Sequence, residues 1–283
     1  MKIGKLHMVL IFAFICLACV LALLALSRYT RAQQIPNSAL ALAVKMQAHT
    51  FTFDKPAHTL PYRFFVPKDI SEKTKKPLIL VLQTAYGRGD NNLSQLDASV
   101  RKLVAMAESH MELSSFILAP QCPKHLEWID SPAIKPPFTN IHFEDFTIGW
   151  REQALRALLK ELLDSYPIDE QRIYIVGGSM GATGAWSMLY RFPDLFAAGL
   201  IMNGRSDPSI ASVINTPLWV FHGAKDSIAP VSNSVEMSQA LNQAGNKAVK
   251  LTILEDAGHN ISKAAVNKHS LDWLFRQVAS VAN

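Results

Sequence analysis

Short apolar runs recur along the chain and constrain its fold more than any other feature. Continuous apolar runs of four to six residues suit parallel strands that are covered on both faces. The runs lie at residues 78–82, 116–119, 173–176, 198–202, 218–221 and 249–254. The last run includes the polar residues Lys250 and Thr252. We therefore expect this last strand near an edge of the sheet.

Helical patterns lie between several of these runs. Residues 150–164 place leucines on one helical face, and Pro167 ends the pattern. Residues 234–244 and 270–281 are two further predicted helices. Strands that alternate with helices predict an α/β fold, with a mostly parallel central sheet and helices on both faces. We expect one such domain over residues 47–283.

An antiparallel hairpin is predicted ahead of the first apolar run. Residues 50–53 and 62–66 are rich in β-branched and aromatic residues. The polar turn Asp54-Lys55-Pro56 lies between them. Two such segments around a turn are typical of a hairpin.

The N-terminus carries a targeting pattern. Residues 8–26 are apolar and uncharged, and Lys2 and Lys5 precede them. This is the pattern of an export signal or a membrane anchor. The length of the run favours a membrane anchor. Small residues at its end are also compatible with cleavage by a signal peptidase, so a cleaved signal is the alternative. We predict a signal or anchor segment over residues 1–32, a linker over 33–46, and a body outside the cytoplasm, periplasmic in a bacterium.

Charge and cysteine content argue against other classes of protein. The net charge is +5, but residues 1–32 hold four basic residues and no acidic one, so the body is nearly neutral. Nucleic acid is therefore not an expected partner. Cys16 and Cys19 form a C-x-x-C inside the apolar segment, where we expect no redox or metal role. No H-E-x-x-H motif or cysteine–histidine cluster occurs, so no metal or cofactor is predicted.

The segment Gly177-Gly178-Ser179-Met180-Gly181 carries the chemistry. It is a G-x-S-x-G motif between a predicted strand and a predicted helix, which is the context of a nucleophile elbow. So tight a turn strains the serine backbone and requires small residues two positions before and after it. The helix N-terminus beside the serine favours developing negative charge. Outside this context, G-x-S-x-G also fits an ordinary glycine-rich turn or a phosphate cradle.

A nucleophilic serine needs a base, and the base needs an acid that orients it. Asp226 follows the fifth apolar run and His259 follows the sixth. Both residues therefore come just past the carboxyl ends of strands, where sites in open α/β sheets form. Asp256 and Glu255 remain alternative acids, and His222 is interpreted as a buried structural histidine.

On these residues the chain resembles the α/β-hydrolase superfamily. It looks most like the esterase and predicted-peptidase branch related to feruloyl esterases, polyhydroxybutyrate depolymerases and dienelactone hydrolases. The resemblance extends from about residue 62 to residue 277. It rests on residues 117–123 with Trp128, 172–181, 219–226 and 258–259. The resemblance implies that Ser179 is the nucleophile, Asp226 the acid and His259 the base.

One segment departs from the pattern of these relatives. They place a His-Gly pair after an early core strand, where this chain has Gln83-Thr84 followed by Ala85. The resemblance implies an oxyanion hole formed by the N–H groups of Met180 and Ala85. Three functions therefore stay open: an esterase, a serine peptidase or amidase, and a non-catalytic binding protein on a hydrolase scaffold, which this departure suggests.

The expected site is open and suits small esters. The connection after the fourth apolar run is too short for a cap domain. The long connection over residues 120–145 carries aromatic residues, which either pack down or form an apolar wall. We predict Trp128 and Tyr86 as substrate-binding residues. The predicted reaction is hydrolysis of short-chain or aryl carboxylic esters, in small molecules or polymers, through an acyl-enzyme on Ser179.

Overall fold

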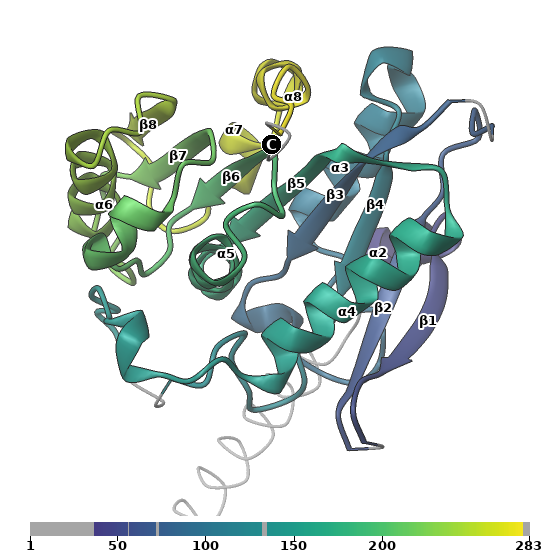
Figure 1. The fold of residues 1–283 in the computed structure, drawn as a ribbon, viewed down its shortest axis with the longest axis horizontal. Coiled ribbons are helices and arrows are strands. Elements are labelled where there is room, and N and C mark those ends of the chain that lie inside the picture. The colour runs from purple at the N-terminus through teal and green to yellow at the C-terminus, as the bar shows by residue number, and fades with distance from the viewer. Residues whose placement is uncertain (1–36, 56, 72–73, 132–134, 280–283) are drawn as a thin grey trace, which may run out of the picture. The chain divides into compact units, whose positions relative to one another are not determined.

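The computed structural model describes residues 37–55, 57–71, 74–131 and 135–279. From residue 38 to residue 279, the described residues form one compact unit, built on an eight-stranded sheet of order β1-β2-β4-β3-β5-β6-β7-β8 (Figure 1). The strands are β1 (Gln47–Thr52), β2 (Thr59–Phe65), β3 (Lys76–Leu82), β4 (Phe116–Pro120), β5 (Ile168–Gly178), β6 (Ala198–Met202), β7 (Leu218–Gly223) and β8 (Val249–Leu254).

All six apolar runs form strands, as predicted. In the order β4-β3-β5-β6-β7-β8, each strand is parallel to its neighbour in the sheet. Strands β1 and β2 form the expected antiparallel hairpin, and β2 pairs with β4 to join this hairpin to the sheet. Strands β4 and β7 are buried along their whole length, whereas Lys250 on β8 is exposed. The mostly parallel sheet and the edge position of β8 are therefore confirmed.

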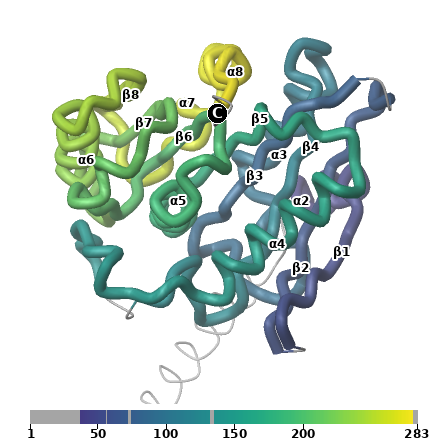
Figure 2. The backbone as a smooth tube through the Cα atoms, viewed as in Figure 1, coloured from purple at the N-terminus to yellow at the C-terminus, as the bar shows by residue number. Residues whose placement is uncertain are grey.

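Helices cover both faces of this sheet. They are α2 (Asn37–Ala43), α3 (Ala98–Ser109), α4 (Trp150–Ser165), α5 (Met180–Arg191), α6 (Ser232–Gln243), α7 (Ser262–Ala265) and α8 (Lys268–Phe275). Figure 1 shows α4 and α5 on the near side of the strands and α3 on the far side, and the tube in Figure 2 shows the same layers. The leucine face of α4 is buried as predicted, and α5 packs on β3 and β5.

Helix α3 is an element that the sequence analysis did not predict. Its buried residues Val100, Leu103, Val104 and Ala107 follow helical spacing. The Asp97 carboxylate caps its first turn by accepting the N–H groups of Ser99 and Val100. Both signals are present in the sequence, so pattern reasoning could have found this helix.

The expected linker over residues 33–46 needs a correction. Residues 33–36 lie outside the described residues, but Asn37–Ala43 form helix α2. Leu42 and Met46 are buried, and Arg63 donates to the carbonyl oxygens of Ala43 and Met46. Most of this segment therefore belongs to the domain, because the apolar residues of the segment pack against the rest of the domain.

Two connections shape the surroundings of the site. Between β6 and β7 the described residues contain one 3-10 helix, Pro208–Val213, and no cap domain. The long connection from β4 to α4 contains another 3-10 helix, Phe143–Asp145. The apolar segment 8–26 lies outside the described residues, and within them no helix is long and apolar enough to cross a membrane.

Candidate active site

Ser179 occupies the sharp turn between β5 and α5. Its backbone has φ 53° and ψ −118°, a region that residues with a side chain rarely adopt. A Cβ atom on Gly181 would lie 1.9 Å from the carbonyl oxygen of Leu82, and one on Gly177 would lie 2.3 Å from the carbonyl oxygen of Gly181. The requirement for small residues two positions before and after Ser179 is therefore confirmed.

The structure brings Ser179, His259 and Asp226 together at the carboxyl edge of the sheet. The Ser179 hydroxyl lies 2.8 Å from His259 Nε2, and His259 Nδ1 lies 2.7 Å from Asp226 Oδ2. Because Nδ1 faces a carboxylate acceptor, it carries the proton of the neutral ring. Nε2 is then free to accept the proton of the Ser179 hydroxyl.

The alternative acids do not reach His259. Asp256 is 96% exposed and forms an ion pair with Lys225 at 2.8 Å. Glu255 is exposed as well. Of the three carboxylates weighed from the sequence, Asp226 alone contacts the imidazole.

The carboxylate of Asp226 is fully buried and well satisfied. Its Oδ1 accepts the N–H groups of Ile228 and Ala229 at 2.8 and 3.0 Å. Its Oδ2 accepts from His259 and lies 3.3 Å from His222 Nε2. Burial alone would raise the pKa of Asp226, but the hydrogen bonds from both histidines and both amides outweigh it and hold the pKa well below its usual range.

His222 is a buried histidine, as interpreted from the sequence. Its Nε2 lies 2.9 Å from the Ala229 carbonyl oxygen, so that nitrogen donates, and Nδ1 accepts from the Ser234 hydroxyl at 2.7 Å. Its proximity to Asp226 is a contact that the sequence analysis missed. His222 lies on β7 and Asp226 in the turn that follows it, so their spacing in the sequence carried no signal for this contact.

The predicted oxyanion donors line the same cleft as Ser179. Met180 is the first residue of α5, and Ala85 is the first residue of the 3-10 helix Ala85–Gly87. The N–H group of a residue in the first turn of a helix has no intrahelical acceptor. Both N–H groups are thus available to a bound oxyanion.

Gln83, where the sequence departs from the family that it resembles, supports this loop. Gln83 is buried, and its side-chain amide lies 2.8 Å from both the Pro120 carbonyl oxygen and the Cys122 N–H, so it can donate to one and accept from the other. The Gln83 carbonyl oxygen accepts from the indole of Trp128 at 3.2 Å. Gln83 therefore joins the end of β3 to the long connection after β4.

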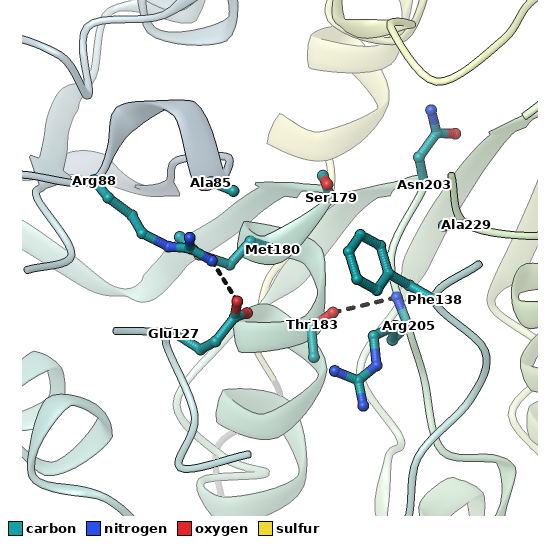
Figure 3. A pocket seen from close by; sticks show the side chains of 10 residues that line it. All are labelled: Ala85, Arg88, Glu127, Phe138, Ser179, Met180, Thr183, Asn203, Arg205 and Ala229. Atoms are coloured by element: carbon teal, nitrogen blue, oxygen red, sulfur yellow. Dashed lines mark hydrogen bonds and ion pairs between the residues drawn. The ribbon is translucent and has the colours of Figure 1, made fainter. Parts of the chain in front are cut away.

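Two clefts meet at Ser179. The first has a volume of about 250 Å³ and appears in Figure 3. It is lined by Ala85, Arg88, Glu127, Phe138, Ser179, Met180, Thr183, Asn203, Arg205 and Ala229. The second has a volume of about 290 Å³, and Tyr86, His259 and Ile261 line it together with Ser179. His259 lines the second cleft and not the first.

The prediction that Trp128 binds substrate is wrong. Its side chain is 1% exposed and packs against Gly184. A Cβ atom on Gly184 would lie only 2.6 Å from the Cβ atom of Trp128. The other expectation for this connection, aromatic residues that pack down, holds for Trp128. Phe138, from the same connection, lines the first cleft instead. Tyr86 is 91% exposed and lines the second cleft, where its role in binding stays a prediction.

The structure adds polar residues that the sequence analysis did not single out. Arg88 and Glu127 form an ion pair in the wall of the first cleft. Asn203 donates to the His259 carbonyl oxygen and accepts the Gly223 N–H at 3.2 Å. Asn203 directly follows β6, so its place at the carboxyl edge was the available signal. Within the described ranges, no group of three His, Cys, Asp or Glu residues is placed to hold a metal ion.

Comparisons with known proteins find hydrolases that are similar to this chain in sequence or in fold. Residues 202–280, which include Asp226 and His259, match the prolyl oligopeptidase family. Among solved structures, a thermostable esterase is 33% identical, with a TM-score of 0.73 over 83% of this chain and 64% of that chain. The chain therefore spans slightly less than two thirds of that esterase. No curated protein matches the sequence.

Two further solved structures share the fold at lower identity. A ferulic acid esterase is 18% identical, with a TM-score of 0.59 over 82% of this chain and 98% of that chain. The acylaminoacyl peptidase of Pyrococcus horikoshii is 16% identical, with a TM-score of 0.55 over 84% of this chain and 42% of that chain. These similarities show that the chain has the α/β-hydrolase fold, as its sequence motifs predicted.

The buried carboxylate predicts a pH-dependent contribution to stability. Because the pKa of Asp226 is lower in the folded chain than in the unfolded one, its ionised form stabilises the fold above the unfolded value of about 3.9. This contribution is lost as the pH falls below that value. Urea unfolding should show Asp226→Asn to cost about 1–3 kcal/mol at pH 7, with a smaller difference from wild type near pH 3.

The exposed Asp256 is the matched control. Asp256→Asn removes a surface ion pair with Lys225 and should leave the unfolding free energy nearly unchanged at both pH values. A wild-type-like unfolding free energy for Asp226→Asn at pH 7 would contradict the stabilising role of this carboxylate.

Proposed function

We propose that the protein is a serine hydrolase that cleaves carboxylic esters through an acyl-enzyme on Ser179. One observation carries the proposal: the Ser179 hydroxyl, His259 and Asp226 form a continuous hydrogen-bonded chain of 2.8 and 2.7 Å where two clefts meet. A hydroxyl held by an imidazole that a buried carboxylate orients is the arrangement of an activated nucleophile.

In acylation, His259 Nε2 takes the proton as Ser179 Oγ attacks the ester carbonyl carbon. Asp226 holds the ring in the tautomer that this transfer needs and stabilises the imidazolium that results. The N–H groups of Met180 and Ala85 donate to the oxyanion of the tetrahedral intermediate. His259 then gives the proton to the departing alcohol oxygen, and the acyl group remains on Ser179.

In deacylation, water takes the place of the alcohol. His259 removes a proton from this water, which attacks the acyl carbonyl carbon, and Ser179 Oγ leaves with that proton. Because His259 protonates the leaving alcohol, the alcohol must lie on the side of His259. We therefore assign the second cleft to the alcohol part of the ester and the first cleft to the acyl part.

Peptide or amide hydrolysis by the same residues is the second candidate function. The match of residues 202–280 to the prolyl oligopeptidase family supports it. The similarity to a thermostable esterase covers far more of the chain and supports the ester reaction. The two reactions share the acyl-enzyme and differ in the leaving group that His259 protonates.

We also propose that the enzyme acts outside the cytoplasm, held at a membrane by residues 8–26. The support is the uncharged apolar run preceded by Lys2 and Lys5. Secretion after cleavage of this segment is the alternative.

Replacement of the nucleophile tests the mechanism. Ser179→Ala should lower kcat for a p-nitrophenyl ester by about four to six orders of magnitude, because no acyl-enzyme can form. Ser262→Ala changes another serine in the wall of the second cleft and should keep activity within a few-fold of wild type. Near wild-type turnover by Ser179→Ala, with its fold checked by circular dichroism, would refute the assignment.

A substrate panel tests the substrate class. Acetyl, butyryl and feruloyl esters should have higher kcat/KM than a palmitoyl ester, by about tenfold or more, because two small clefts without a cap domain suit short or aryl groups. No rate jump should occur above the micellar concentration of the long-chain ester. A butyryl anilide is the amide control, and preferential cleavage of it would favour the peptidase.

Cell fractionation tests the location. The full chain should be recovered with membranes, whereas a variant without residues 1–32 should remain in the soluble cytoplasmic fraction, because the apolar run has been removed. Full-length protein in the soluble cytoplasmic fraction with Met1 intact would contradict both the anchor and the signal.

A further inference from the structure

Arg205 is a cation in the wall of the first cleft that the proposed chemistry does not use. It follows β6 by three residues and lines the cleft together with Ser179 and Phe138. In Figure 3, Phe138 and Arg205 lie on one side of the cleft, and Arg88 and Glu127 lie on the other. The Arg205 guanidinium points away from Ser179. A group that reaches it must extend beyond the reacting carbonyl.

The guanidinium of Arg205 is largely unpartnered within the described residues. Its Nε donates to the Thr139 carbonyl oxygen at 3.2 Å, and its two terminal nitrogens make no hydrogen bond there. No carboxylate of the described chain lies within ion-pair distance of it. The other arginine of the cleft differs, because Arg88 is paired with Glu127.

The charges of the cleft wall therefore leave one positive charge in excess. Arg88 and Glu127 offset each other, and Arg205 remains. Partial burial lowers the pKa of Arg205, and the negative charge of Glu127 has a smaller opposite effect. Arginine stays charged at neutral pH, and its planar terminal nitrogens match a carboxylate with two parallel hydrogen bonds.

The side of the cleft fixes which part of the substrate meets this charge. The first cleft takes the acyl part, because the departing alcohol must lie beside His259. Phe138 offers an apolar surface in the same cleft. An acyl chain with a methylene segment and a terminal anion would pack its methylenes against Phe138 and pair its anion with Arg205.

We propose that the first cleft binds acyl groups that end in a carboxylate, and that Arg205 binds this carboxylate. The preferred substrates are then monoesters of short dicarboxylic acids, cleaved to the free diacid and an alcohol. This assignment rests on the proposed function, because the acyl side is defined by proton transfer from His259.

Paired substrates test the proposal. p-Nitrophenyl monoesters of glutaric, adipic and suberic acid would be compared with esters that carry a terminal carboxamide of the same length, after subtraction of spontaneous hydrolysis. The wild-type enzyme should prefer the carboxylate member of at least one pair. Arg205→Gln should lower kcat/KM for that ester by about tenfold, mainly through KM, and leave the carboxamide ester within about twofold.

Two further variants separate charge from shape. Arg205→Lys keeps the charge but loses the planar pair of donors, so its kcat/KM should fall between those of wild type and Arg205→Gln. Arg156 lies on α4 and lines neither cleft. Arg156→Gln removes the same charge there and should leave kcat/KM unchanged for both esters of the pair. Equal loss on both members of a pair in Arg205→Gln, or no loss on either, would overturn the proposal.

Binding of free adipate separates this proposal from the proposed function. Calorimetry should show adipate binding to the wild-type chain and about tenfold weaker binding to Arg205→Gln. If no ester is hydrolysed, the hydrolase proposal fails, and Arg205-dependent adipate binding still supports the carboxylate site. Adipate binding that is absent, or that is unchanged in Arg205→Gln, overturns the carboxylate site even where neutral esters are cleaved.

Discussion

The close contact between the first turn of α5 and the ends of β3 and β5 is the constraint on which the site depends. Gly181 lies so near the Leu82 carbonyl oxygen, and Gly177 so near Gly181, that no side chain fits at either position. This contact forces Ser179 into a positive φ angle and places its hydroxyl at the carboxyl edge of the sheet. The same turn leaves the N–H group of Met180 free to donate. One steric requirement therefore provides both the nucleophile and an oxyanion donor.

The second requirement is a buried negative charge that stays ionised. Asp226 has no exposed side-chain surface, and the Ile228 and Ala229 amides and two histidines compensate for the lost hydration. The charge in turn fixes the tautomer of His259 that can accept the proton of Ser179. His222 contacts the same carboxylate from a fully buried position, so it belongs to the structure that holds the acid in place.

Features carried by local pattern were predictable from the sequence. The apolar runs gave the strands, and the elbow motif with Asp226 and His259 gave three residues that the structure brings together. Features set by packing between distant segments were not predictable. Trp128 faces Gly184 and the core instead of the cleft, and Arg205 enters the cleft wall through the pairing of β6 with its neighbours. Neither placement has a signature in neighbouring residues.

The most direct test of the central claim is to locate the adduct of a fluorophosphonate by peptide mass spectrometry. The reagent phosphonylates a serine only where a base has activated its hydroxyl. We expect a single adduct on Ser179, and His259→Ala and Asp226→Asn should slow its formation by orders of magnitude while both variants remain folded. An unlabelled wild-type chain, or labelling of Ser179 at the same rate in His259→Ala, would contradict activation of Ser179 by His259.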